Sequence, residues 1–221
     1  MKKRKEFQKM ENFDISVQRF DEFADEFAHR FADVSGYADS IDRFCELIGN
    51  DRPQILELGC GPGNVTSLLK VRFPEARITA IDLAPKMIEI AGKHLPDVDF
   101  RVMDVRDIST IPEKFDAVMC SFCLPFLSRN DASQLIADCA KKLNPAGLLY
   151  ISTMEGDETR AGFETTSFSG ESEIYFNYHS RPDLENSLTE SGFEISQLKL
   201  QDYPEPDGRI TTDMIFIAKK I

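Results

Sequence analysis

From Gln54 onward, short apolar runs alternate with segments of helical period, and this alternation constrains the fold more than any other feature. The apolar runs have the length of strands and lie at residues 55–58, 78–81, 98–102, 117–120 and 148–151. In the segments between them, apolar residues recur at steps of three and four, as in the series Ala84, Ile88, Ala91 and Leu95. Strands that alternate with helices pair in parallel through right-handed crossovers, so the pattern predicts an α/β fold whose sheet is covered by helices on both faces.

The two ends of the chain depart from this alternation. Phenylalanines at steps of three and four predict helices in residues 1–50, with a break at Ser35-Gly36. Residues 154–180 combine acidic side chains, dispersed glycines and aromatics, and we expect a long excursion from the sheet there. A helix near 182–191 precedes two strand-like runs, and the Tyr-Pro-Glu-Pro-Asp-Gly joint between these runs predicts an antiparallel hairpin at the end of the sheet. Together, these elements predict a Rossmann-like three-layer sandwich with a seven-stranded, mostly parallel sheet.

The charge balance disfavours nucleic-acid partners. The 221 residues include 26 basic and 38 acidic side chains, a formal net charge of −12, and such a field repels phosphate backbones. No run approaches the ~18 apolar residues of a membrane helix, and the basic start at residues 1–5 is not followed by the apolar core of a secretory leader. We therefore expect a cytoplasmic protein with no membrane partner, either a monomer or a homodimer.

The five cysteines lie in or beside apolar runs, and their number is odd. Cys120 and Cys123 have the spacing of half a zinc or redox site, but no second pair follows and no histidine is close to them in the sequence. We expect buried, reduced thiols and no metal site.

The most informative segment is a glycine-rich turn between a strand and a helix. Gly59, Gly61 and Gly63 occupy alternate positions, which lets the backbone turn sharply and leaves no Cβ between the turn and a ligand. Asp82 follows nineteen residues after Gly63 at the end of the next strand, where a carboxylate can accept hydrogen bonds from both ribose hydroxyls of a nucleoside. Asp104 ends the third strand and is placed to meet the base. This constellation predicts a nucleoside-containing ligand.

The turn does not fit a nicotinamide cofactor well. A Gly-x-Gly-x-x-Gly turn would need glycine at position 64, where this chain has Asn64. The segment instead resembles the class I S-adenosylmethionine-dependent methyltransferases of the small-molecule type, over residues 54–153 in detail. The matching motifs are Glu57-Leu-Gly-Cys-Gly-Pro-Gly63, Ala80-Ile-Asp-Leu-Ala-Pro-Lys-Met87, Val102-Met-Asp-Val105, Phe115-Asp-Ala-Val-Met-Cys120 and Leu143-Asn-Pro-Ala-Gly-Leu-Leu149.

The resemblance implies S-adenosylmethionine as cofactor and a set of binding residues. The glycines would border its methionine moiety, Glu57 would support the turn and the amino group, and Asp82 would take the ribose. Asp104 would accept from the adenine amino group, and Cys120 would close the methionine end. The whole implied set is Glu57, Gly59, Cys60, Gly61, Gly63, Asp82, Leu83, Met87, Asp104, Val105 and Cys120.

The N-terminal helix resembles a further motif of the small-molecule members, Tyr-Asp-x-x-Ala-x-x-Tyr, with both tyrosines replaced. The corresponding segment here is Phe20-Asp-Glu-Phe-Ala-Asp-Glu-Phe27. Any hydroxyl contact from those two positions to the cofactor is therefore absent in this chain. The phenylalanines either cover the cofactor or only pack in the core.

The acceptor site should come from the segments outside the core pattern. We divide a single domain, 1–221, into an N-terminal helical cap (1–50), a cofactor-binding core (51–153), an acceptor-site lid (154–180) and a completion of the sheet (181–221). The aromatic lid favours a small-molecule acceptor. His179 is the candidate base, with Tyr178 beside it. The alternative is that His179 only contacts solvent.

Three other functions stay open at this point. The chain could be a non-catalytic S-adenosylmethionine-binding module, a protein methyltransferase, or a nicotinamide-dependent reductase on the same sheet.

Overall fold

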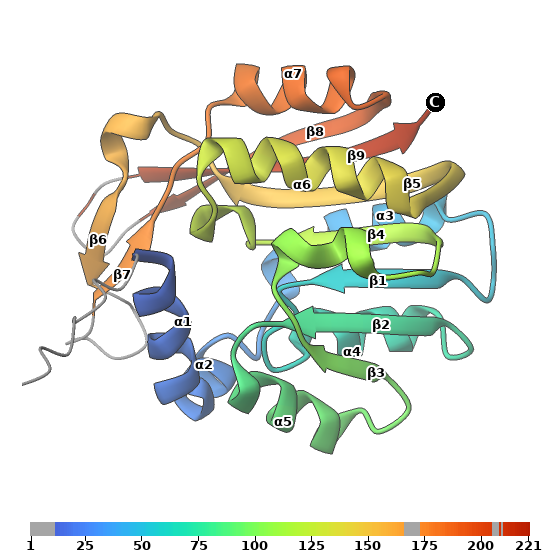
Figure 1. Ribbon diagram of the computed structural model, residues 1–221, viewed down its shortest axis with the longest axis horizontal. Helices are drawn as coiled ribbons and strands as arrows, with labels where there is room; N and C mark the ends of the chain where they lie inside the picture. Colours follow the sequence, from blue (N-terminus) through green and yellow to red (C-terminus); the bar gives the residue numbers. More distant parts are fainter. Residues whose placement is uncertain (1–11, 166–172, 205–207, 209) are drawn as a thin grey trace, which may run out of the picture.

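The alternating runs form one seven-stranded sheet in a computed structural model that describes residues 12–165, 173–204, 208 and 210–221. The strand order is β3-β2-β1-β4-β5-β9-β8, and β9 runs antiparallel to both of its neighbours whereas the first five strands are parallel (Figure 1). The predicted seven-stranded fold with its antiparallel C-terminal hairpin is confirmed. Its strands are β1 (Gln54–Leu58), β2 (Arg77–Asp82), β3 (Asp99–Val102), β4 (Phe115–Ser121), β5 (Leu143–Met154), β8 (Phe193–Pro204) and β9 (Ile210–Lys220).

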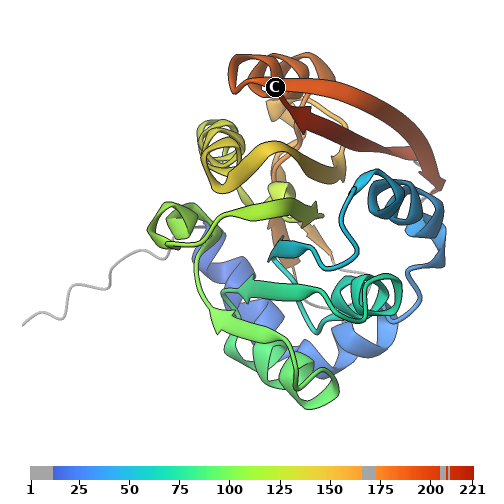
Figure 2. The same ribbon diagram turned by 90° about the vertical axis from the view of Figure 1, so that its right-hand side faces the viewer.

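Helices cover both faces of this sheet, as Figure 2 shows along the strands. One face is covered by α3 (Ala38–Leu47), α4 (Asn64–Arg72) and α5 (Pro85–His94). The other is covered by α6 (Arg129–Lys142), α7 (Arg181–Glu190) and the short 3-10 helix η2 (Val105–Thr110).

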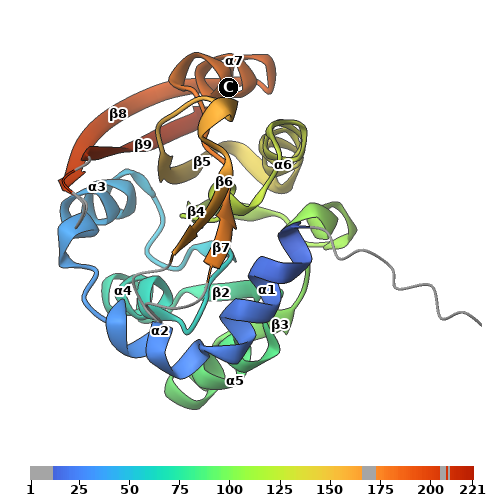
Figure 3. The same ribbon diagram turned by 90° about the vertical axis from the view of Figure 1, so that its left-hand side faces the viewer.

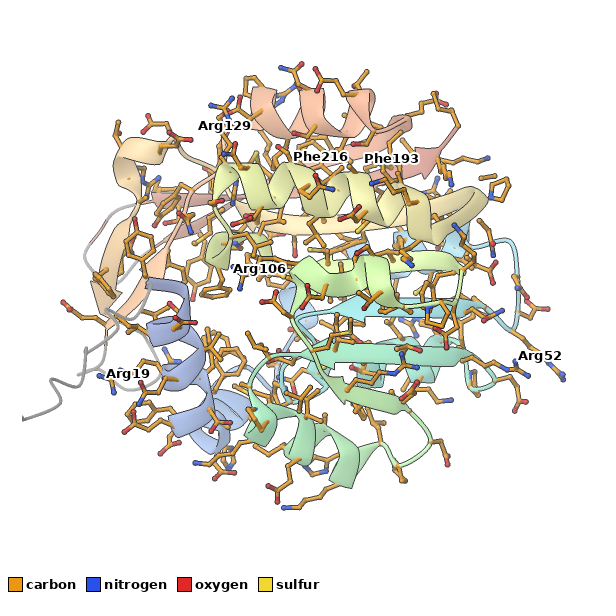
Figure 4. All side chains as sticks on the ribbon, viewed as in Figure 1. Arg19, Arg52, Arg106, Arg129, Phe193 and Phe216 are labelled. Atoms are coloured by element: carbon orange, nitrogen blue, oxygen red, sulfur yellow. The ribbon has the colours of Figure 1, made fainter. Side chains whose placement is uncertain are left out.

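Alternate residues of each strand enter separate cores. Leu56 and Leu58 pack with the side chains of α6 and α7, whereas Ile55 packs with those of α3 and α4, and all three are fully buried. Phe193 of β8 and Phe216 of β9 belong to the first of these cores (Figure 4). Strands buried on both faces read as continuous apolar runs, which is why the core was visible in the sequence.

The N-terminal helix is broken at one more place than the sequence indicates. It divides into α1 (Asn12–Glu22) and α2 (Ala24–Arg30), because Phe23 has a ψ of +30° and leaves the helical geometry. The break turns α2 across the sheet end, and the 3-10 helix η1 (Ser35–Tyr37) then forms the break expected at Ser35-Gly36.

The excursion after β5 contains regular structure. Its elements are the 3-10 helix η4 (Glu158–Arg160) and an antiparallel two-stranded sheet of β6 (Gly162–Thr165) and β7 (Glu173–Phe176). Figure 3 looks at the carboxyl ends of the parallel strands and shows this hairpin in front of them together with α1 and α2. Parts of the predicted cap (1–11) and lid (166–172) lie outside the described residues.

No helix in the described part of the chain is both long and apolar enough to cross a bilayer.

Candidate active site

The glycine turn has the conformation that its sequence predicts. Gly59, Gly61 and Gly63 have φ values of +63°, +54° and +88°, in the left-handed region that side chains disfavour. A Cβ on Gly59 or Gly63 would lie 3.2 Å from the Cβ atoms of Cys123 and Ala91, respectively. At Gly61 the nearest atom would be Cε1 of Phe27, at 3.8 Å. The turn therefore packs tightly at its two ends and presents bare backbone at its centre.

Asp82 clamps this turn from the end of β2. Its Oδ2 accepts a hydrogen bond from the Gly61 N–H and its Oδ1 from the Ala84 N–H, each at 2.9 Å. Burial raises the pKa of this carboxyl, and the backbone N–H groups oppose that rise. Leu83 is half-buried beside it, whereas Met87 is fully buried against Ala84 and the α2 residue Ala24.

Glu57 lies inside β1, directly beneath the turn. It is only 2% exposed, and its Oε2 accepts a hydrogen bond from the Thr66 hydroxyl at 2.6 Å. No basic side chain in the described part of the chain forms an ion pair with it. Burial raises the pKa of Glu57 to about 8. A ligand that brings a positive charge would stabilise the ionised form of this carboxyl.

Asp104 sits at the start of η2, where its Oδ1 accepts from the Arg106 N–H at 2.8 Å. The Arg106 guanidinium also lies against this carboxylate, at 2.6 Å between Nη2 and Oδ2. Val105 turns into the core that contains α6. Arg106 is a residue that the sequence reasoning missed, although the Asp-x-Arg spacing at a predicted strand end was a signal for it. Figure 4 shows Arg106 at the same end of the sheet as α1, with Arg52 at the opposite end.

The thiols around the turn are buried. Cys120, at the end of β4, is 1% exposed, and Cys123 and Cys60 are nearly as buried. A hydrogen bond to Cys120 and burial both raise the pKa of the Cys123 thiol. Burial raises that of Cys60. The Cys60 and Cys123 thiols therefore stay protonated and chemically inert. The burial of all three cysteines agrees with the expected buried thiols.

Five partly exposed phenylalanines, which we call the phenylalanine cluster, cover this end of the sheet. Phe20 contacts Phe27 edge to face, with ring centroids 5.4 Å apart, and contacts Phe126 in the same manner at 4.9 Å. Phe31 lies 4.6 Å from Phe27, and Phe176 lies 5.6 Å from Phe126. The cluster comprises Phe20 of α1, Phe27 of α2, Phe31 just after α2, Phe126 of the 3-10 helix η3 (Leu124–Phe126) and Phe176 of β7.

Tyr178 and His179 follow β7, the second strand of the β6–β7 hairpin, and are almost fully buried. The Tyr178 hydroxyl donates to Glu164 Oε1 at 2.5 Å, and the Arg160 guanidinium lies 4.2 Å above the Tyr178 ring. His179 Nε2 is 2.8 Å from the Leu124 carbonyl oxygen, which can only accept, so this nitrogen carries the proton. Burial lowers the pKa of His179, which keeps the ring neutral.

Asn177 reinforces this junction and was missed by the sequence reasoning. Its backbone N–H and its side-chain amide both donate to the Pro125 carbonyl, at 2.7 and 3.3 Å. With His179, it ties the hairpin to consecutive carbonyl groups of η3. On the other side, the Tyr175 N–H donates to the Ser16 hydroxyl, so the hairpin is also tied to α1.

Metal ligands do not gather at this site. Among the described residues, no group of three or more histidine, cysteine, aspartate and glutamate side chains is placed to hold a metal ion.

Comparisons with known proteins agree with the geometry of the turn. Residues 55–147 match the family model of a methyltransferase domain. Trans-aconitate 2-methyltransferase of Escherichia coli is 39% identical over 97 residues, which is 44% of this chain and 37% of that protein. The chain therefore matches well under half of the length of this curated relative. Demethylmenaquinone methyltransferase of Thermotoga maritima is 29% identical over 176 residues, which is 70% of this chain and 76% of the relative.

A solved structure extends the likeness to the whole fold. Magnesium protoporphyrin IX methyltransferase from Synechocystis PCC 6803, solved with bound S-adenosylmethionine, superposes with a TM-score of 0.73 at 17% identity. The match covers 97% of this chain and 99% of that one. These findings show that residues 55–147 match a methyltransferase domain in sequence and that the whole chain has the fold of a methyltransferase solved with S-adenosylmethionine.

Proposed function

We propose that this protein transfers a methyl group from S-adenosylmethionine to a small-molecule acceptor. The observation that carries the proposal is the clamped glycine turn, with bare backbone at Gly61 and the phenylalanine cluster above it. The relatives named above methylate small molecules according to their names, which supports the same class of acceptor here.

The residues present fit this cofactor. Glu57 is a buried carboxylate without a basic side-chain partner, which suits the amino group of a methionine moiety. Asp82 retains acceptor capacity beyond its two backbone hydrogen bonds, which suits ribose hydroxyls. The other contacts that the resemblance implies are part of the same proposal; they involve Gly59, Cys60, Gly61, Gly63, Leu83, Met87, Asp104, Val105 and Cys120. When bound, S-adenosylmethionine supplies an electrophilic methyl group on a sulfonium.

The chain's own contribution is alignment and exclusion of water. A well-oriented displacement gains up to roughly 7–11 kcal/mol over the reaction in solution. The cap, 1–50, and the lid, 154–180, would hold the acceptor in line above the core, 51–153, while residues 181–221 complete the sheet. Because the phenylalanine cluster brings only carbon atoms to this position, it can exclude water but cannot move a proton.

Tyr178 and His179 stay candidates for the acceptor side of the reaction. His179 could serve as a base only through Nδ1, because Nε2 donates to the Leu124 carbonyl. That hydrogen bond favours a second role, in which His179 positions η3, and with it Phe126, beneath the lid.

We also propose a cytoplasmic protein, because its five cysteines are free and buried in the structure and free thiols persist in reducing compartments. Both a monomer and a homodimer fit this proposal.

The test is calorimetry followed by a transfer assay. S-adenosylmethionine and S-adenosylhomocysteine should bind, NADH should not, and methyl-labelled S-adenosylmethionine should label a small acceptor. Binding of NADH alone would contradict the proposal in favour of a reductase. Cofactor binding with no transfer to any acceptor would indicate a non-catalytic module, and label in added proteins would indicate a protein methyltransferase.

A further inference from the structure

The phenylalanine cluster forms an unbroken path of rings from the glycine turn to the lid. It begins at Phe27, whose Cε1 faces Gly61, and continues through Phe20 and Phe126 to Phe176. These four rings are only partly buried, unlike core residues such as Phe44 and Phe115. An acceptor that approaches the turn along this path meets aromatic carbon.

Four arginines around the cluster already have partners. Arg19 pairs with Glu22 at 2.7 Å and is directed away from the sheet (Figure 4), while Arg106 pairs with Asp104 at 2.6 Å. Arg129 pairs with Asp183, and Arg160 lies over the Tyr178 ring. The three other basic side chains of α1, α2 and the first turn of α5 are exposed to solvent, namely His29, Arg30 and Lys86. Among the described residues, a negatively charged acceptor would therefore find no unpaired buried cation beside the rings to replace its lost hydration.

The surrounding segments are strongly acidic. The described residues of 12–31 and 154–180 contain ten aspartates and glutamates against three arginines and no lysine. Such an imbalance creates a negative potential that concentrates cations near the site. The faces of phenylalanine rings also attract positive charge.

From this combination we infer that the acceptor is an amine attached to an apolar group. The inference rests on the proposed methyltransferase function and specifies its substrate class. The negative potential attracts the protonated amine to the site, and the amine attacks as the neutral base after its proton has passed to water. No side-chain base is then needed at the point of attack.

The transfer balances without any further reactant. The neutral nitrogen donates its lone pair to the methyl carbon, and an N–C bond forms as the C–S bond breaks. The electron pair of the C–S bond stays on sulfur, which leaves S-adenosylhomocysteine. The nitrogen acquires the positive charge, which the ring faces of the cluster stabilise, and a proton that it still carries leaves later to water.

The test compares two probes of similar shape and opposite charge, phenethylamine and 3-phenylpropanoate. Each is titrated by calorimetry into the protein saturated with S-adenosylhomocysteine, and each is offered to the protein with methyl-labelled S-adenosylmethionine. We expect the amine to bind at least about tenfold more tightly than the acid, a difference of roughly 1.4 kcal/mol, and to accept the label in preference to it.

Variants of the cluster then locate the amine. Phe126→Leu and Phe176→Leu remove a ring face but keep an apolar side chain, and each should weaken phenethylamine binding about fivefold or more while S-adenosylhomocysteine affinity stays the same. Phe163→Leu is the matched control, because Phe163 lies on the same hairpin, is 44% exposed and is outside the cluster. It should leave both affinities unchanged.

The outcomes separate the two proposals. Equal or tighter binding of 3-phenylpropanoate, binding of neither probe, or an equal effect of Phe163→Leu would overturn the amine acceptor and leave the methyltransferase standing. Failure of S-adenosylhomocysteine itself to bind would overturn the proposed function.

Discussion

Two carboxylates at the glycine turn stabilise the fold in addition to the cofactor contacts that we propose for them. Asp82 holds Gly61 through a backbone N–H, and Glu57 holds Thr66 on α4. A substitution at either residue therefore changes the shape of the turn together with its charge. Predictions at these positions need controls that share the structural cost without touching the site.

The first prediction concerns Asp82. Asp82→Ala should weaken S-adenosylhomocysteine binding by roughly 1.5–3 kcal/mol, since it removes a charged acceptor from the ribose and releases Gly61. Calorimetry measures the affinity. Asp116→Asn is the control, because Asp116 also accepts a backbone N–H, from Gln54, but lies at the opposite end of the strands. An Asp82→Ala protein that binds with unchanged affinity would refute the assignment.

A second prediction tests the bare backbone at Gly61. Gly61→Val should abolish S-adenosylhomocysteine binding, because a side chain there projects from the centre of the turn toward Phe27. The control is Gly192→Val. Gly192 has a φ of +82° with no atom within 4 Å of its Cβ position, so its substitution introduces backbone strain without a clash. Both variants should lose stability in urea unfolding, and only Gly61→Val should lose binding. Retained binding by Gly61→Val would place the ligand elsewhere.

A pH prediction follows from Glu57. Its pKa of about 8 in the fold is above the ordinary value of 4.5, so between these values the folded state binds a proton that the unfolded state has lost. The contribution of Glu57 to stability is therefore fully present below pH ~4.5 and declines as the pH rises to about 8. Urea unfolding across this range should show the decline, and Glu57→Gln should reduce it. Parallel pH profiles for the two proteins would contradict the assignment.

Among the elements, the β6–β7 hairpin is the one whose attachment shapes the proposed acceptor side. It is tied to α1 through Ser16 and to η3 through Asn177 and His179. The helices α1 and α2 and the 3-10 helix η3 each contribute phenylalanines to the cluster. The hairpin binds two of these elements, α1 and η3, which carry Phe20 and Phe126. An acceptor-selecting lid at 154–180 remains a proposal that these contacts support.

The fourth prediction separates the two roles of His179. His179→Gln keeps an N–H donor for the Leu124 carbonyl and should retain most of the turnover, with an unchanged pH profile. His179→Leu loses the donor and should lower kcat about tenfold, roughly 1.4 kcal/mol in the barrier, with unchanged S-adenosylhomocysteine affinity. Steady-state kinetics from pH 6 to 9 would measure both. If Gln is as damaging as Leu and the acidic limb of the profile disappears, His179 acts as the base.

At the scale of the whole molecule, the turn connects the two cores. Ile55 and Leu58 of β1 belong to opposite cores, and the turn that follows them is packed against Cys123 and Ala91. A ligand seated on the turn therefore stabilises the entire domain.

The last prediction measures this coupling. S-adenosylhomocysteine at about 100 times its Kd should add roughly 2.7 kcal/mol of stability, equivalent to an increase in Tm on the order of 5–10 °C for a domain of this size. EDTA should change neither Tm nor turnover, since we expect no metal. Scanning calorimetry with and without each additive tests both statements. Lost activity that magnesium restores would contradict the second.

Local sequence determined the strands, the helices between them and the glycine turn. Each depends on a short-range property: a period of two or 3.6 residues, or the tolerance of glycine for positive φ. The spacing from Gly63 to Asp82 likewise follows from the length of one strand–helix–strand unit. The break at Phe23 was not visible, because the apolar period continues through it.

Only the tertiary structure decided how the proposed acceptor side is built. The Tyr178 hydroxyl meets Glu164, His179 meets Leu124, and Phe20 meets Phe126, more than one hundred residues away in the chain. No local period records such contacts, because they arise when a hairpin and two helices settle over the ends of strands that come from elsewhere in the sequence. The proposed cofactor side lies within consecutive strand–helix units and can be predicted from the sequence. The proposed acceptor side is assembled from distant segments and can be identified only in the folded structure.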